Sequence, residues 1–593
     1  MTITGTNFTG APGVKFGAIA AAGFTVNNAT TITATSPAGT GTIDVTVTTP
    51  SGTSAISPAD RFTFGTPSAP TGVTAVAGDG EATLTWTLPT AGAPITGFTV
   101  VATPGGAAVT VSPVVPAATI TGLTNGTSYT FTVTASNGIG TGLASVPSAA
   151  VTPTAVAQGS SVSVLPAMHN GAYGGYLTAA YIQNTGANAA HIRVQYFDQA
   201  GSAVGIGNSV AGLVAGATWT LRTDNGHSLG AMQPGSAIVY SDQPLSVFVN
   251  DFAPGNTSDA SSYTGISVPA GTGATLYAPA IANGAYGGYT TGIGLVNLSS
   301  SPTNITVTYR DGAGMVAKTQ TLNSVAGGAY QGLYSGDPAL ALPAGFAGTA
   351  TITSSAGNLA AVVNESGPGG QLSSYDAVPA GSMTLYAPAA LNNAYGGYNT
   401  GMGIQNTTGS AGTVTIDYFD SSGTATTNTF PIGANGYLGV YQGTDIPVAG
   451  AYTARLTSTV PIAAIVTEVA PSATSARQST AYNTFAAGSS SQRLPLVESA
   501  GADGWSTGDV IMNTGAAATL VTVTYYDAVT GTQVGTPQSL TVQPNAIWGL
   551  YQPTGGLPAG TRASAIVTTA AGGQVAVICN ESNATTFMSY IGQ

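Results

Sequence analysis

The stretch NITVTYRDGAGMV, residues 304–316, decides the fold class of this chain. Apolar and polar residues alternate from Ile305 to Tyr309, which is the period of a β-strand with one buried face. The alternation breaks at Asp311-Gly312, a strong short-range signal for a hairpin. The stretch therefore predicts two antiparallel strands joined by a tight turn.

The same pattern occurs four times along the chain. Strands of the type VTYRD end in Asp198, Asp311, Asp420 and Asp527, and strands of the type YIQN carry Asn184, Asn297, Asn406 and Asn513. Both series step by 113, 109 and 107 residues, and Tyr263, Tyr375, Tyr482 and Tyr590 close each unit. A period near 110 residues is too long for a solenoid repeat and matches one immunoglobulin-like β-sandwich.

Composition agrees with an all-β protein of several domains. The chain has 593 residues, of which 43% are hydrophobic and only 5% are charged, where about 25% charged is usual. Its net charge of -12 is dilute, and its ten Lys and Arg residues form no patch. We therefore expect no nucleic-acid partner, and no apolar stretch is long enough for a membrane span.

The segments before the repeats carry other motifs. ITGTNFTGA at 3–11, VKFG at 14–17 and RFTFG at 61–65 lie in residues 1–66, which resemble a TIG immunoglobulin-like domain that lacks its first strand. PSAPTGV at 67–73, Trp86 and TGLTNGTSYTFTV at 121–133 make residues 67–154 resemble a fibronectin type III domain. That resemblance implies a core Trp86 and a tyrosine-corner Tyr129.

The repeats themselves resemble those of large secreted bacterial surface proteins. The motifs that carry this resemblance are RLPLVES at 493–499, VTYYD at 523–527 and LPAG at 557–560. The family has no assigned enzymatic activity. The resemblance implies exposure at the cell surface. The sequence predicts a tandem array of about six β-sandwich domains, arranged as beads on a string: 1–66, 67–154, 160–270, 271–380, 381–488 and 489–593.

A glycine-rich turn with two tyrosines recurs in the repeats, as in NGAYGGYTTG at 283–292. A phosphate cradle is excluded because the turn lacks the lysine and the helix start of such sites. The second aromatic of the turn is kept in every repeat, as Tyr176, Tyr289, Tyr398 and Trp505. We therefore predict that each of these residues packs in the core of its own domain, as Trp86 and Tyr129 are expected to do. The first aromatic of the turn is Tyr173, Tyr286 and Tyr395 in the first three repeats and becomes Ala502 in the last. We therefore predict that these three tyrosines make assembly contacts between repeats or between subunits.

Other polar residues give candidate sites with simpler explanations. The pairs Asn250-Asp251, Asn364-Glu365, Thr467-Glu468 and Asn580-Glu581 could offer a carboxylate to calcium, place a charge at a junction of repeats, or bond the backbone at a strand end. The Asp198 series suits the first position of a turn. Cys579 is expected to be a buried free thiol. His169, His191 and His227, all in the first repeat, lack metal-site spacing and are expected to be solvated or in turns.

These observations favour a structural function. No nucleophile, base and orienting acid can be assembled by motif, so we predict no enzyme and no cofactor, with calcium left open. We expect a secreted, extracellular structural subunit of a filament, sheath or surface layer whose partners are copies of itself. If the chain begins near Met1, a strand from another subunit could complete the first domain, although a gene truncated upstream explains the same start.

Two alternatives stay open at this point. The first is an adhesin or glycan-binding stalk, whose partners would be surface glycans or a host cell envelope. The second is a stalk from a larger secreted enzyme.

Overall fold

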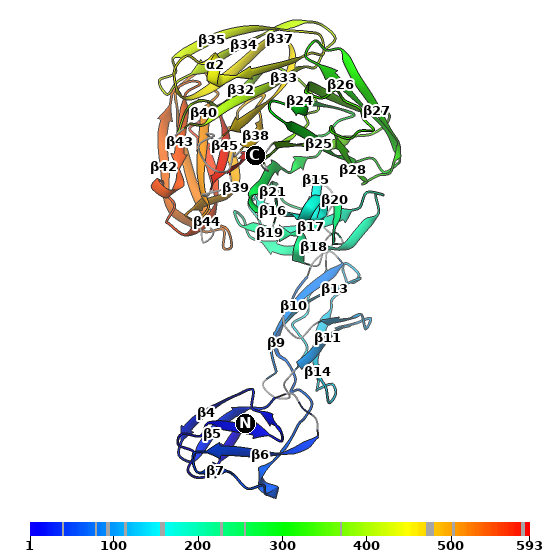
Figure 1. The fold of residues 1–593 in the computed structure, drawn as a ribbon, viewed down its shortest axis with the longest axis vertical. Helices are drawn as coiled ribbons and strands as arrows, with labels where there is room; N and C mark the ends of the chain where they lie inside the picture. The colour runs from blue at the N-terminus through cyan, green and yellow to red at the C-terminus, as the bar shows by residue number, and fades with distance from the viewer. Residues whose placement is uncertain are drawn as a thin grey trace. The chain divides into compact units, whose positions relative to one another are not determined.

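The computed structural model is almost entirely β-sheet and divides into two compact units, Met1–Ala155 and Val156–Gln593 (Figure 1). It describes the chain except residues 38, 40, 78–79, 90–94, 112–115, 154–160, 226–228, 230, 254–255, 368–370, 396, 470–478, 501–503 and 583–586. The predicted fold class, a tandem array of immunoglobulin-like β-sandwiches, is confirmed.

The first unit contains two small sandwiches. In the first, one sheet is β1 (Thr2–Thr4), β5 (Thr31–Thr35) and β4 (Gly23–Asn28). The other is β3 (Ile19–Ala20), β2 (Gly13–Phe16), β6 (Thr42–Thr49), β7 (Gly52–Thr53) and β8 (Arg61–Thr63). Side chains alternate between the two faces of these strands, so Val14, Phe16, Ile32 and Val47 point into a shared core.

The second sandwich has two three-stranded sheets. They are β9 (Thr71–Ala77), β10 (Glu81–Thr87) and β13 (Ala117–Thr121), and β11 (Ile95–Thr103), β12 (Ala108–Val111) and β14 (Thr130–Asn137). Trp86 lies in the core with its ring centroid 5.1 Å from that of Phe98. The buried Tyr129 accepts a hydrogen bond from the backbone N–H of Thr124 through its hydroxyl, at 3.0 Å.

Each repeat of the second unit is a sandwich of two layers, and in repeat 2, described here, the layers belong to one eight-stranded sheet joined at the hairpin of β24 (Thr275–Ala285) and β25 (Tyr289–Asn297). The first layer has the order β27 (Val316–Val325), β26 (Thr303–Asp311), β29 (Phe346–Ser354) and β24. The second has β28 (Tyr330–Tyr334), β25, β30 (Leu359–Gly367) and β31 (Gln371–Asp376). Leu276, Val307, Ile352 and Val363 fill the space between the layers.

The other repeats use equivalent strands. Repeat 1 has β15 (Ser161–Gly171), α1 (Ala172–Gly175), β16 (Tyr176–Asn184), β17 (Ala190–Phe197), β18 (Ala203–Leu213), β19 (Thr218–Arg222), β20 (Gln233–Ser241), β21 (Leu245–Ala253), β22 (Asn256–Thr264) and β23 (Ile266–Ser267). Repeat 3 has β32 (Ser382–Asn392), β33 (Asn399–Asn406), β34 (Gly412–Phe419), β35 (Ala425–Ile432), β36 (Tyr437–Tyr441), α2 (Gln442–Asp445), β37 (Gly450–Val469) and β38 (Ser479–Asn483). Repeat 4 has β39 (Ser491–Ser499), β40 (Ser506–Asn513), β41 (Thr519–Asp527), β42 (Gln533–Val542), β43 (Ile547–Tyr551), β44 (Thr561–Thr569), β45 (Val575–Ser582) and β46 (Phe587–Ile591).

A bulge in the first strand of each repeat explains the tyrosine that closes it. In β24 the pairing with β29 shifts between Ala278 and Ile281, around Pro279. Proline cannot donate to a sheet ladder, so the strand bulges there and leaves backbone groups unpaired. The buried Tyr375 hydroxyl bonds the carbonyl oxygen of Ala280 and accepts from its N–H. Tyr263, Tyr482 and Tyr590 bond Ala167, Ala389 and Leu496 in the same way.

The Asn297 series and the Asp311 series of residues fix the loops that follow their strands by hydrogen bonds to the backbone. Asn297 donates to the carbonyl oxygens of Ser301 and Val325 and accepts from the N–H of Ser299. Asp311 accepts from the N–H groups of Ala313 and Met315, which is the turn chemistry predicted for that series. The equivalent asparagines and aspartates make matching bonds.

The four repeats form a closed ring, so the expectation of separate beads is wrong for them. Strands β22, β31, β38 and β46, which carry the closing tyrosines of the four repeats, contact one another in a cycle, including β46 with β22. Figure 1 shows the four repeats arranged around a common centre. Repeat 4 bonds repeat 1 through Thr218, whose N–H donates to the Ala528 oxygen at 2.8 Å. Hydrogen bonds also join Ser564 to Gly216 and Gln593 to Val247.

Small side chains allow the four strands to meet at the centre of the ring. Ser262, Ser374, Ala481 and Ser589 precede the four closing tyrosines, which turn into their own sandwiches. The central strands leave a cavity of about 10 Å³, enough for about one water molecule. Hydrogen bonds cross the centre from Thr264 to Asp376 at 2.8 Å and from Ser262 to the Ser589 oxygen at 2.6 Å.

Candidate functional site

The glycine-rich turns lie at junctions between successive repeats. Tyr286 stands in repeat 2 with a φ of 53° and 64% of its surface exposed. A positive φ is strained for a bulky residue and often marks a functional position. Its hydroxyl lies 2.9 Å from the hydroxyl of Tyr437, on β36 of repeat 3. Tyr286 therefore contacts the next repeat of the same chain.

Tyr395 occupies the same place one repeat further on. Its φ is 48°, 64% of its surface is exposed, and its hydroxyl lies 3.3 Å from the point where a Cβ atom at Gly549 of repeat 4 would stand. A side chain at Gly549 would therefore meet Tyr395. The side chain of Tyr173 and all of Ala502 lie outside the described residues.

The second aromatics of the turns are half-buried rather than fully enclosed. Tyr398 packs against the core of repeat 3, and Tyr176 lines a cleft described below. Tyr289 and Trp505 are also half-buried at the matching positions. Trp86 and Tyr129 are buried in the second sandwich of the first unit.

The asparagine and acid pairs lie inside strands at the junctions, rather than bonding the backbone at strand ends. The Asn580 amide of repeat 4 donates to the Glu468 carboxylate of repeat 3, at 3.2 Å. The Asn250 side chain of repeat 1 bonds the Glu581 carboxylate of repeat 4. An amide of one repeat thus meets a buried carboxylate of the preceding repeat, which matches the junction interpretation of these pairs.

Burial changes the acidity of these carboxyl groups. Desolvation disfavours the charged form and raises the pKa of Glu365 to about 7 and that of Glu468 to about 8. The pKa of Glu581 is held well above its usual range by burial and by the nearby Glu498. Asp376 at the ring centre has a pKa of about 7, again because of burial.

Repeat 1 places a histidine beside its buried acid, so the expectation of solvated or turn histidines is wrong for His169. His169 on β15 is 6% exposed, and its Nδ1 lies 3.3 Å from Oδ1 of Asp251 on β21. The Thr178 hydroxyl donates to the same Oδ1. Strand alternation turns His169 inward, where it lies beside the Asp251 carboxylate.

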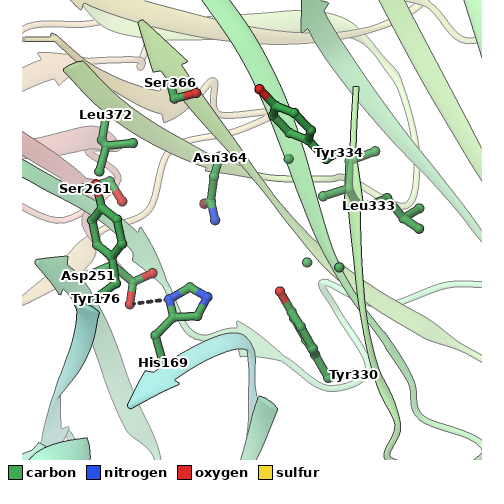
Figure 2. A pocket seen from close by; sticks show the side chains of 14 residues that line it. His169, Tyr176, Asp251, Ser261, Tyr330, Leu333, Tyr334, Asn364, Ser366 and Leu372 are labelled. Atoms are coloured by element: carbon green, nitrogen blue, oxygen red, sulfur yellow. Dashed lines mark ion pairs between the residues drawn. The ribbon is translucent and has the colours of Figure 1, made fainter. Parts of the chain in front are cut away.

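A cleft of about 470 Å³ opens beside this pair, between repeats 1 and 2. Figure 2 shows His169, Asn364 and Tyr330 pointing toward the same space, with Tyr176 and Ser261 beside Asp251. The remaining lining residues are Asp251, Gly292, Ile293, Gly294, Gly332, Leu333, Tyr334, Ser366 and Leu372. Sequence patterns missed this cleft because its walls come from different repeats.

Repeat 4 has a different polar group at the position of His169. Glu498 is buried there, and the Arg562 guanidinium donates to its carboxylate. Repeats 2 and 3 have Ala282 and Leu391 at this position, both buried and apolar. Each junction therefore has its own chemistry on a shared backbone.

The remaining candidates are structural. Cys579 is a buried free thiol, and burial raises its pKa well above the usual value. His191 is half-exposed and bonds Asp242 at 2.7 Å, whereas His227 lies outside the described residues. Within the part of the chain that the structure describes, no three His, Cys, Asp or Glu side chains gather to hold a metal ion. None of its described helices has the length and apolarity needed to cross a membrane.

Comparison with known proteins identifies one domain. Residues 68–151 match the fibronectin type III domain family, and this segment is such a domain. No curated protein matches the chain. The TIG resemblance of residues 1–66 and the resemblance of the repeats to bacterial surface proteins stay predictions.

Three solved structures have limited similarity to parts of this chain. The chicken CNTN1 domains FN1–FN3 are 16% identical over 41% of this chain and 86% of theirs, with a TM-score of 0.18. Titin domains A168–A170 are 22% identical over 24% of this chain and 53% of theirs, with a TM-score of 0.15. A myokine structure is 22% identical over 15% of this chain and 98% of its own, with a TM-score of 0.13.

Proposed function

We propose that this protein is a structural subunit of an extracellular bacterial surface assembly, a filament, sheath or surface layer, that associates with copies of itself. Tandem fibronectin-like and immunoglobulin-like sandwiches are the architecture of a structural or adhesive repeat protein. Such domains are typical of extracellular proteins and serve as scaffolds, although a fold alone assigns no partner. The choice of self-association rests on the surface of the repeats.

The observation that carries the proposal is a repeated set of exposed tyrosines. Tyr334, Tyr441 and Tyr551 end the equivalent strands β28, β36 and β43 and are 51%, 50% and 51% exposed. We call these three residues the strand-end tyrosines. Exposed tyrosines are typical of interfaces because a ring buries much apolar area while its hydroxyl still bonds.

The low charge of the chain favours the same use of this surface. Only 5% of residues are charged, so long-range repulsion between copies is weak. Soluble monomers usually carry more surface charge than this. The strand-end tyrosines of one ring can therefore approach those of another without a large electrostatic penalty.

The first sandwich offers a second route to association. β1 pairs with β5 along one side and forms the edge of its three-stranded sheet. A strand from another subunit could add to the outer side of β1 by β-augmentation.

Sedimentation velocity and negative-stain imaging of the full chain test the proposal. We expect a sedimentation coefficient that rises with concentration, and ordered assemblies on the grid. Replacing the three strand-end tyrosines by serine should reduce this association. A matched control replaces Val316, Val448 and Val529, which are exposed apolar residues outside these positions, by serine. A wild-type chain that stays a monodisperse monomer would refute self-association.

A further inference from the structure

We propose that the cleft between repeats 1 and 2 binds a neutral carbohydrate, with a sugar ring held against Tyr334 and its hydroxyl groups bonded to Asp251 and Asn364. This inference goes beyond self-association and does not depend on it. It assigns a binding site to one junction of the ring.

The size of the cleft suits a small ligand. Its volume of about 470 Å³ lies within the roughly 300–1,000 Å³ of most small-molecule sites. Its walls come from two sandwiches that the closed ring holds together, so the site is preformed. A preformed site loses little entropy when it binds, which favours affinity for a weakly interacting ligand such as a sugar.

The polar side of the cleft is built around Asp251. This carboxylate is 2% exposed, and its Oδ1 accepts from the Thr178 hydroxyl, while His169 Nδ1 lies 3.3 Å from it. Among the described residues, its Oδ2 has no hydrogen-bond partner. A buried carboxylate oxygen without a partner is costly, and a hydroxyl donor from a ligand would satisfy it.

Asn364 and Ser366 of repeat 2 complete the hydrogen-bonding groups (Figure 2). Asn364 uses its Oδ1 to accept from the Ser374 hydroxyl at 2.8 Å, an arrangement that fixes the amide plane. An amide offers donors and an acceptor, and a hydroxyl can act as either. Neighbouring hydroxyl groups of a sugar have this same mixed character, so they suit the cleft better than a ligand with donors only.

The apolar side of the cleft suits the C–H face of a sugar. Gly292, Gly294 and Gly332 add no side chains to the wall, while Ile293 and Leu333 are buried behind it. Tyr334 stands at the edge of the cleft with about half of its surface exposed, whereas Tyr330 lines the cleft but is buried with the core of repeat 1 (Figure 2). Tyrosine combines an apolar ring with a polar hydroxyl, which matches an amphipathic ligand.

Charge selects a neutral sugar. The Asp251 carboxylate disfavours acidic sugars, and among the described lining residues there is no lysine or arginine to bind an anion. A neutral hexose-containing oligosaccharide therefore fits the electrostatics of the cleft.

The other junctions differ at the residues that matter. Ala282 and Leu391 replace His169 in repeats 2 and 3, so those repeats lack the histidine that orients the acid. The carbohydrate site is therefore assigned to the junction of repeats 1 and 2.

The test uses the full chain and an array of defined neutral and acidic oligosaccharides, followed by calorimetric titration of the strongest neutral tetrasaccharide. We expect binding of neutral oligosaccharides. Tyr334→Ala and Asn364→Ala should each weaken it by about tenfold or more, as expected when a stacking or hydrogen-bonding group is removed.

Matched controls come from the next junction. Tyr441→Ala removes a strand-end tyrosine of equal exposure, and Thr467→Ala changes the residue equivalent to Asn364, so both should leave affinity within about twofold. Absence of neutral-saccharide binding at about 1 mM would overturn the proposal. The proposal would also be overturned if the chain bound acidic sugars, or the cationic peptide tetralysine, more tightly than neutral sugars. An equal loss of affinity in the cleft variants and the control variants would overturn it too. Self-association is measured in a separate experiment, so failure of one proposal does not imply failure of the other.

Discussion

The hydroxyl of Tyr286 in repeat 2 lies 2.9 Å from the hydroxyl of Tyr437 in repeat 3, although 151 residues separate them along the chain. The pair joins two sandwiches that each have their own core. It shows how the glycine-rich turn works in this protein: the turn holds a tyrosine at a positive φ so that its ring crosses to the next repeat.

This pair should couple the two repeats energetically. We expect Tyr286→Phe and Tyr437→Phe each to lower the free energy of unfolding by about 0.5–1.5 kcal/mol, because each removes one hydroxyl of the bond. The double variant should cost less than the sum, since the second substitution has no bond left to remove. Urea denaturation of the three variants measures this, and strict additivity would show that the two hydroxyls do not interact.

The closing tyrosines should matter more than the exposed ones. Tyr375→Phe leaves the bulged backbone at Ala280 without its buried partner, and we expect a loss of about 1–3 kcal/mol in unfolding free energy. Tyr334→Phe is the control, because the hydrogen bond that its hydroxyl makes among the described residues is with the Thr290 side chain, near the surface. Equal effects of the two substitutions in urea denaturation would contradict the assigned function of Tyr375.

Stability should fall as the pH rises from 5 to 8. Burial raises the pKa of Glu365 to about 7 and that of Glu468 to about 8, above their values in an unfolded chain. The folded ring therefore holds protons that the unfolded chain releases above about pH 4.5. The stabilisation is complete below that pH and is lost as pH rises through the folded pKa values. Thermal melts at both pH values measure the effect, on the order of 5 kcal/mol for the two groups together.

One substitution isolates the source of this dependence. Glu468→Gln removes the titrating group at the junction of repeats 3 and 4, so it should stabilise the ring at pH 8 and have little effect at pH 5. Asp337→Asn changes an exposed acid and should leave the pH profile unchanged. A profile that is the same in wild type and Glu468→Gln would show that this carboxyl does not titrate as described.

Much of each repeat could be predicted from the sequence because its signals are local. Alternation, the Asp311 turn and the spacing of the Tyr375 series predict a sandwich of about 110 residues. The closing tyrosine and the loop asparagine act inside one repeat. Their partners are mostly backbone groups, so their position in the pattern was enough to place them.

Ring closure could not be predicted because each junction uses the same surfaces on different repeats. Nothing in one sequence says whether the Tyr286 turn meets the next repeat or another chain. His169 was missed for a related reason, since its partner Asp251 lies on another strand. A usable signal was present in the asparagine and acid pairs, which interrupt apolar strands such as LAAVVNES at 359–366.

Closure of the ring is tested most directly by a disulfide between repeats 1 and 4. The backbone bond from Thr218 to Ala528 is 2.8 Å long, and a disulfide needs Cα atoms about 4.4–6.8 Å apart. The variant with Thr218→Cys and Ala528→Cys should form an intramolecular disulfide under mild oxidation, seen as faster mobility on a non-reducing gel. Thr218→Cys with Gly312→Cys, the equivalent turn of repeat 2, should not. Absence of the first disulfide, or its formation only between chains, would contradict the closed ring.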